Sequence, residues 1–199
     1  MNKGKALKIG AIALSAALLG GALVYYNFIH KEEETSFEIG KICPDFTVGT
    51  YKVEDGNFVV GEDFTLSQAL GKVCVLNFWE TWCSGCIMEL PDFNEFYQNY
   101  ADKGVAVVAI AGNTSTVDTA MQWMNLDGWR TLTPDVDWRE FSLTFAIQKE
   151  AMEVYRKTGG TSGALPRTVI LDQTGKAVYQ TDGSMHYEDL EELVLPLLA

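Results

Sequence analysis

The chain has 199 residues, of which 47% are hydrophobic and 21% charged, and its formal net charge is −12 at pH 7. This length allows one domain with a sizeable core plus an appendage. The negative charge argues against a role in binding nucleic acid or an anionic membrane surface.

Residues 1–34 read as an appendage to the domain. Three lysines near the start precede an apolar run at residues 9–29, which spans about 30 Å at helical rise, enough to cross a membrane. The lysines favour a cytoplasmic N-terminus, so the pattern predicts a single-pass anchor in the cell membrane, a short linker and an extracytoplasmic domain at residues 35–199. The alternative is a signal peptide that is cleaved to give a secreted protein.

The start of the domain reads as a β-rich preface. Segments 46–53 and 58–60 carry alternating or clustered apolar residues, and they flank Asp55-Gly56, a dipeptide that favours a tight turn. The pattern therefore predicts a β-hairpin ahead of the main sheet.

The stretch that carries the chemistry comes next. Residues 73–79 are a near-continuous apolar run rich in β-branched and aromatic residues, which predicts a strand buried on both faces. From Ile87 to Tyr100 apolar residues recur in steps of three and four, the spacing of an amphipathic helix. Cys83 and Cys86 lie between the two segments, so Cys83 is expected at the N-terminus of the helix.

This location has a chemical consequence for the two cysteines. Unpaired amides and the positive end of the helix dipole stabilise a thiolate, which lowers the pKa of the thiol and enriches the nucleophilic form. Cys83 is therefore predicted to attack a disulfide, and Cys86 to resolve the mixed disulfide by exchange. Glu89 lies on the same side of the helix as Cys86 and is predicted to take or deliver a proton as Cys86 changes state.

The remaining chain alternates predicted strands and helices. Strands are predicted at residues 105–111 and 141–147, and helices at 116–126 and 150–157, an order that implies parallel crossovers. Residues 129–141 mix aromatic and acidic residues without a regular period. The chain ends with a predicted strand at 168–171, a turn at 172–175, an edge strand at 177–181 and a helix at 187–198.

Residues 78–91, F-W-E-T-W-C-S-G-C-I-M-E-L-P, resemble the active-site stretch of the TlpA/ResA-like thioredoxins, which are exported or membrane-anchored thiol-disulfide oxidoreductases. C-P-D-F at residues 43–46 is similar to the A-P-D-F entry of the family's N-terminal hairpin, and G-A-L-P-R-T at 163–168 is similar to its G-x-P-x-T segment. The resemblance implies an α/β thioredoxin-like fold. A central mixed β-sheet would be flanked by helices, with an N-terminal β-hairpin extension behind the expected transmembrane helix.

The resemblance also implies a docking face for clients. The family's proline is cis and faces the dithiol, which predicts a cis Leu165-Pro166 bond; taken alone, a Leu-Pro bond is usually trans. The backbone of Leu165 would then pair with an extended client strand beside Cys83. Trp82 and Pro166 are expected to shape the surface that receives the client.

The function implied by the resemblance is a protein-disulfide reductase that exchanges its Cys83-Cys86 dithiol or disulfide with client proteins, such as apocytochromes in cytochrome c maturation. A membrane electron donor of the CcdA/DsbD type would re-reduce it, and no cofactor or metal is expected. A protein disulfide oxidant or isomerase is the alternative. The Ser84-Gly85 pair lacks the histidine of strongly oxidising C-P-H-C sites, which disfavours a potent oxidant.

Other functional classes fit the residues less well. A zinc site would need two more ligands, yet the only histidines are His30 and His186, beside the apolar run and the last predicted helix. Covalent haem attachment requires C-x-x-C-H, and Ile87 stands in the histidine position. A peroxiredoxin-like peroxidase would resemble T-x-x-C, whereas here the threonine precedes the first cysteine by two residues. A redox-inactive binding module on the same fold stays open.

Four further residues have two interpretations each. Glu80, where the family mostly has a small residue, either points inward and raises the pKa of a nearby thiol or is a solvated side chain at the strand end. Arg167 would lower that pKa if it reaches the sulfurs. Cys43 and Cys74 are predicted to be buried thiols packed as small apolar residues, and the alternative is a structural disulfide.

Overall fold

The computed structural model describes residues 38–111, 117–147 and 153–198. The anchor predicted at 9–29, the linker after it and the domain boundary expected at residue 35 lie outside these residues. Within the described ranges, no helix combines the length and the apolar character needed to span a membrane.

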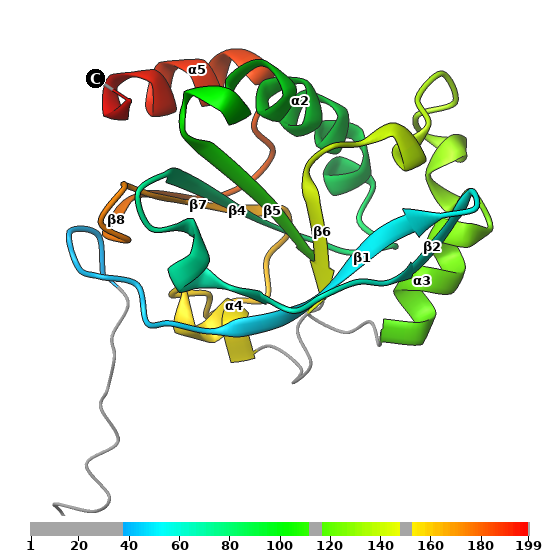
Figure 1. Cartoon of the computed structure of the whole chain (residues 1–199), viewed down its shortest axis with the longest axis horizontal. Helices are drawn as coiled ribbons and strands as arrows, with labels where there is room; N and C mark the ends of the chain where they lie inside the picture. Colours follow the sequence, from blue (N-terminus) through cyan, green and yellow to red (C-terminus); the bar gives the residue numbers. More distant parts are fainter. Residues whose placement is uncertain (1–37, 112–116, 148–152, 199) are drawn as a thin grey trace, which may run out of the picture. The chain divides into compact units, whose positions relative to one another are not determined.

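The described residues form a mixed β-sheet with helices on both faces (Figure 1). The strand order is β2-β1-β6-β5-β4-β7-β8, and β3 pairs with β1 off this path. The strands are β1 (Thr47–Glu54), β2 (Asn57–Val60), β3 (Phe64–Thr65), β4 (Val73–Trp79), β5 (Val105–Ala111), β6 (Thr144–Ile147), β7 (Arg167–Leu171) and β8 (Ala177–Asp182). The α-helices are α2 (Ser84–Tyr100), α3 (Val117–Asn125), α4 (Glu153–Lys157) and α5 (Tyr187–Val194), and short 3₁₀ turns lie at Leu66–Ala69, Ala101–Lys103, Gly128–Thr131, Trp138–Glu140 and Leu195–Leu197.

The centre of the sheet is parallel, as predicted from the alternation of strands and helices. β4 and β5 have the predicted bounds and pair in parallel along their whole lengths, and β6 continues the parallel run. On the other side β7 pairs antiparallel with β4, and β8 with β7. Every residue of β4 is buried, because the strand is flanked by neighbours and covered on both faces.

Helices α2 and α5 cover one face of the sheet, and α4 lies against the other (Figure 1). Successive side chains of a strand point to opposite faces, so β4 supplies both cores. Val75 and Trp79 pack under α2, whereas Leu76 and Phe78 pack on the α4 side. Asn77, between them in the strand, shares the α2 face and reaches that helix with its side chain.

The predicted N-terminal hairpin is present. β1 and β2 are antiparallel, and the pair nearest the turn is Glu54 opposite Asn57. Asp55 and Gly56 both have positive φ angles, 49° and 76°, which the favoured two-residue hairpin turn requires and an Asp-Gly dipeptide tolerates.

The predicted C-terminal helix is interrupted near its end. α5 runs as an α-helix to Val194, with Leu190 and Val194 buried, and continues as a 3₁₀ turn. Pro196 lies at the start of that turn. Proline has no N–H to donate to the preceding turn, so the expectation of one helix over residues 187–198 was wrong at its last turn.

Residues 129–141, which show no periodicity, build an aromatic cluster over one end of the sheet. Trp129 and Trp138 stack with ring centroids 5.4 Å apart, and Trp138 stacks on Phe145 of β6 at 5.5 Å. Trp79, the last residue of β4, meets Trp138 edge-on at 5.5 Å. These contacts join residues far apart in the sequence, and no local repeat predicts them.

Cys43 and Cys74 are free thiols, both buried in the core on the α4 face. Burial raises the pKa of each thiol to about 12; the charge of Asp45 adds to this effect for Cys43, and the neighbouring Cys43 adds to it for Cys74. The prediction of two buried thiols is confirmed, and the structural disulfide between them is not formed.

These pKa values give a prediction for thiol titration. In the folded chain with its other two cysteines oxidised, we expect no reaction of Cys43 or Cys74 with a thiol reagent at about pH 8, because neither thiolate forms and neither sulfur is accessible. Unfolding in guanidinium should release two titratable thiols, and Cys43→Ala should reduce the count to one. Rapid labelling of the folded chain would contradict the burial of these side chains.

Candidate active site

The two cysteines of the C-S-G-C stretch are joined by a disulfide at the N-terminus of α2. Cys83 is the N-cap residue of the helix, as predicted, and the backbone N–H of Cys86 donates to its sulfur at 3.3 Å. The backbone N–H of Cys83 donates to the carbonyl of Glu80 at 3.1 Å, which closes the turn between β4 and α2. The fold thus holds the Cys83 sulfur against the free amides of the helix.

The two sulfurs differ in their access to solvent. Cys83 is 7% exposed, whereas Cys86 is fully buried. Trp82, beside the outer cysteine, is 60% exposed and lies on the surface. This asymmetry is what a division of labour between an attacking and a resolving cysteine requires.

The predicted cis bond between Leu165 and Pro166 is confirmed. A Cβ placed on Gly85 would lie 3.7 Å from Pro166 Cδ and 3.2 Å from Ser184 Oγ, so the proline lies beside the first turn of α2, between the two cysteines. The carbonyl of Pro166 accepts a hydrogen bond from Gly183 N–H at 2.8 Å. The structure therefore brings Pro166 to the dithiol, from a distant part of the chain.

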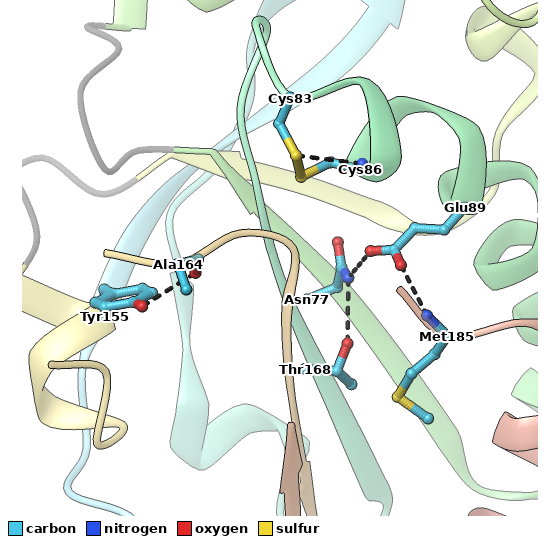
Figure 2. The surroundings of a disulfide bond; sticks show 8 residues. All are labelled: Asn77, Cys83, Cys86, Glu89, Tyr155, Ala164, Thr168 and Met185. Carbon is cyan, nitrogen blue, oxygen red and sulfur yellow. Dashed lines mark hydrogen bonds between the residues drawn. A yellow bond between two sulfur atoms is a disulfide. The ribbon is translucent and has the colours of Figure 1, made fainter. Parts of the chain in front are cut away.

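The loop that leads into the cis proline is tied to the opposite face of the sheet. The hydroxyl of Tyr155 on α4 donates to the carbonyl of Ala164 at 3.1 Å (Figure 2). Tyr155 is itself buried and packs edge-on against Phe78 of β4 with centroids 5.5 Å apart. Leu165 is half-buried at the end of this loop. A packed core side chain thus fixes the backbone just before Leu165.

Glu89 lies one turn beyond Cys86 on α2 and is 1% exposed. Asn77 Nδ2 donates to Glu89 Oε1 at 2.7 Å, and the backbone N–H of Met185 donates to Oε2 at 2.9 Å (Figure 2). Burial raises the pKa of the Glu89 carboxyl from 4.5 to about 7, against the lowering by these two hydrogen bonds. The carboxyl therefore exchanges its proton near neutral pH, which suits a general acid or base.

Sequence patterns did not identify the partners of Glu89. Asn77 Nδ2 also donates to Thr168 Oγ1 on β7 at 3.3 Å, and both side chains are fully buried. One signal was available, because Asn77 is an amide within the otherwise apolar run at 73–79. Nothing local marks Thr168 or Met185, whose positions depend on the pairing of β4 with β7 and on the approach of the chain to α5.

Two of the open interpretations are now decided. Glu80 is fully buried, so the interpretation that it is a solvated side chain at the strand end was wrong. The guanidinium of Arg167 donates to Asp182 Oδ1 at 2.6 Å, to the carbonyl of Thr158 at 3.0 Å and to Gln180 Oε1 at 2.8 Å. These hydrogen bonds hold the Arg167 guanidinium on the face of the sheet opposite α2, so it does not reach the sulfurs.

The arrangement has the parts that thiol-disulfide exchange requires. It combines an outer sulfur facing a helix amide, a buried second sulfur, a buried carboxyl that titrates near neutral pH and a cis proline beside the pair. Across the ranges that the structure describes, no cluster of three or more His, Cys, Asp or Glu side chains is placed to hold a metal ion.

Known proteins are similar to this sequence over most of its length. Residues 39–180 match the AhpC/TSA family. The chain is 30% identical over 181 residues to the thiol-disulfide oxidoreductase ResA of Bacillus cereus, a match that covers 91% of this chain and 88% of that protein. It is 31% identical over 184 residues to ResA of Geobacillus kaustophilus, covering 90% and 87%. The likeness is therefore not confined to the C-x-x-C stretch.

Solved structures share the fold. A putative thiol:disulfide interchange protein DsbE from Chlorobium tepidum superposes with a TM-score of 0.60 at 24% identity, covering 82% of this chain and all of that one. StoA from Bacillus subtilis gives a TM-score of 0.53 at 21% identity, covering 76% and 96%. The predicted thioredoxin-like α/β fold is thus confirmed for the described domain.

The raised pKa of Glu89 predicts how stability depends on pH. Between pH 4.5 and about 7 the folded state keeps a proton that the unfolded chain has lost, so stability falls as pH rises through this window. The loss should total about 3 kcal/mol. Glu89→Gln should remove this slope, as measured by guanidinium unfolding of the oxidised chain at several pH values. Equal slopes for the two chains would contradict the assigned pKa.

Proposed function

This chain belongs to the AhpC/TSA family and is a ResA-type thiol-disulfide oxidoreductase, and we propose that it works as a membrane-anchored, extracytoplasmic reductant of disulfides in client proteins. The observation that carries the proposal is the Cys83-Cys86 disulfide at the N-terminus of α2, with an amide on the outer sulfur and cis Pro166 beside the loop. This geometry supports exchange at the outer sulfur.

The first step is attack by Cys83. In the dithiol form its thiolate, stabilised by the amides and dipole of α2, forms a bond to one sulfur of the client disulfide. The client S–S bond breaks, and its other sulfur leaves as a thiolate that takes a proton from solvent. Enzyme and client are then joined by a mixed disulfide at Cys83.

The second step is resolution by Cys86. Its thiol passes a proton to the Glu89 carboxylate, and the resulting thiolate bonds to the Cys83 sulfur. The bond from Cys83 to the client breaks, the departing client thiolate takes a second proton from solvent, and Glu89 later returns its proton to solvent. The client has then gained two electrons and two protons, and the enzyme holds the Cys83-Cys86 disulfide that the structure contains.

The client would dock across the surface around the outer sulfur. Trp82 offers an exposed indole next to Cys83 in the chain, and Pro166 lies beside Gly85, between the two cysteines. The backbone of Leu165, held by the anchored loop before it, would pair with an extended segment of the client. These residues would position the client disulfide over Cys83 without contributing charge.

The cellular setting rests on the sequence. The apolar run at residues 9–29 behind three lysines supports an anchor with a cytoplasmic N-terminus, and cleavage of this segment would instead give a secreted enzyme. A domain anchored outside the membrane needs electrons that are carried across the membrane, so we propose a CcdA/DsbD-like membrane protein as its electron donor. We propose apocytochromes that await haem attachment among its clients.

Two alternative activities are separated by measurement. For a reductant, the Cys83-Cys86 couple in the full chain should have a reduction potential of about −270 mV, whereas a value of about −120 mV would make it an oxidant or isomerase. A peroxiredoxin-like peroxidase is less favoured because the T-x-x-C spacing is absent. Consumption of peroxide by the reduced chain, faster than by its Cys83→Ser variant, would establish that activity.

Trapping tests the order of the two cysteines. Cys86→Ser should accumulate a stable mixed disulfide with clients at Cys83, because the resolving thiol is missing, and insulin reduction should fall by about two orders of magnitude or more. Cys83→Ser is the matched control and should trap nothing, since the remaining Cys86 is buried. Equal amounts of mixed disulfide from both variants on non-reducing gels would contradict the roles assigned to the two cysteines.

A further inference from the structure

The central strand β4 carries one buried amide between apolar neighbours. Asn77 is fully buried, and it faces α2 rather than the second core. An amide buried at this depth costs free energy unless its hydrogen bonds are made, so an asparagine here needs a reason. The hydrogen bonds of its side chain supply that reason, because they connect it to the Glu89 carboxyl of the active site.

The donor side of the amide is directed at the catalytic carboxyl. Nδ2 donates to Glu89 Oε1 at 2.7 Å and to Thr168 Oγ1 at 3.3 Å. The backbone N–H of Met185 donates to the other Glu89 oxygen, Oε2, at 2.9 Å. Each carboxylate oxygen thus has one donor, and the two donors come from different elements. Hydrogen bonds to a carboxylate favour its charged form, which burial disfavours. Asn77 therefore fixes the direction of the carboxylate and supports its charge.

The acceptor side of the same amide has no partner within the part of the chain that the structure describes. Oδ1 of Asn77 is fully buried, and no donor of the described residues bonds to it. A buried acceptor left without a hydrogen bond destabilises the folded chain. In Figure 2 this oxygen points toward the end of the site that carries the disulfide. Reduction of that disulfide creates a new donor in the buried part of the site, the S–H of Cys86.

We propose that Asn77 is a positioning residue that aims the Glu89 carboxylate at the resolving cysteine and accepts a hydrogen bond from the Cys86 thiol in the dithiol state. The inference rests on the proposed exchange activity and deepens it. The amide would then contact both the thiol and the carboxylate. The S–H turns from Asn77 Oδ1 to Glu89 and gives up its proton there, the Cys86 sulfur bonds to Cys83, and the bond from Cys83 to the client breaks. The transfer consumes one thiol proton and one carboxylate and yields one thiolate and one carboxylic acid.

The charges around this network come from the helix side. Asp92, further along α2, raises the pKa of Glu89, and His186, just before α5, lowers it. These two groups pair with each other at 3.0 Å, so their opposing effects partly cancel. The contacts from β4 and β7 are the neutral Asn77 and Thr168. Removing the amide should therefore move the proton affinity of Glu89 without changing any formal charge.

The first test follows the pH dependence of the resolving step. The reduced full chain reacts with an aromatic disulfide reagent in two phases, attack by Cys83 and then release of the second reagent thiol by Cys86. We expect the rate of the second phase to rise with a midpoint near pH 7 as Glu89 ionises. In Asn77→Ala the midpoint should move up by about one pH unit, because a hydrogen bond to a charged group is lost.

Two variants separate positioning from packing. Asn77→Asp keeps the size of the side chain but replaces the donor with a carboxylate, so it should move the midpoint upward at least as far. Asn94→Ala is the control, because it removes a second buried asparagine, which lies on α2. Its Oδ1 accepts a hydrogen bond from Ser142 N–H at 2.8 Å, and it lies eight residues beyond Cys86 in the sequence. It should lower stability but keep the wild-type midpoint. An unshifted midpoint in both Asn77 variants, or an equal shift in Asn94→Ala, would overturn the proposal.

A spectroscopic signature tests the acceptor side. In the reduced full chain the S–H stretching band that disappears in Cys86→Ser should lie at lower frequency in wild type than in Asn77→Ala, because a hydrogen bond weakens the S–H bond. Identical frequencies would refute the contact with Oδ1. Failure of the underlying activity would look different, since the wild-type chain would then show no fast release of the reagent thiol in either phase.

Discussion

The contact between the Cys86 amide and the Cys83 sulfur depends on how a buried strand ends. β4 is covered on both faces up to Trp79, and the chain must then turn within a few residues to begin α2. The hydrogen bond from Cys83 N–H to the Glu80 carbonyl closes that turn and leaves Cys83 as the N-cap, at 3.3 Å from the next amide. The paired strand, the closed turn and the cap together set the position of the sulfur, and the proline loop and the buried carboxyl lie around it.

Burial raises the pKa of the two free thiols and of the Glu89 carboxyl, but the consequences for their reactivity differ. For Cys43 and Cys74 it raises the thiol pKa to about 12, which makes them inert in the core. For Glu89 the same effect brings the carboxyl pKa to about 7, into the range where proton transfer is useful, because two hydrogen bonds limit the rise. Reactivity thus follows from the donors around each buried group and from its intrinsic pKa.

Local pattern was enough to predict much of the site. The apolar run gave β4 and β5 their bounds, and the cysteine spacing placed Cys83 at the helix start. The partners of Glu89 could not be predicted, because Thr168 meets Asn77 only through the register of β7 on β4, in which those two residues are opposite each other. The destination of Arg167 depends likewise on its pairing with Asp182 of β8. The aromatic segment after α3 has no hydrophobic periodicity from which its structure could be predicted, because its rings pack on each other and on a distant strand.

The register of β7 also explains why the proline loop and the proton acceptor belong to one unit. β7 begins immediately after Pro166, and its second residue, Thr168, lies opposite Asn77 in the antiparallel pair. The cis proline thus lies directly before the strand that offers the Thr168 hydroxyl to the buried amide two residues later. The Pro166 carbonyl holds Gly183, and Met185, two residues further on, caps the Glu89 carboxylate. Two short routes thus join the proline loop to Glu89, one through Thr168 and Asn77 and the other through Gly183 and Met185.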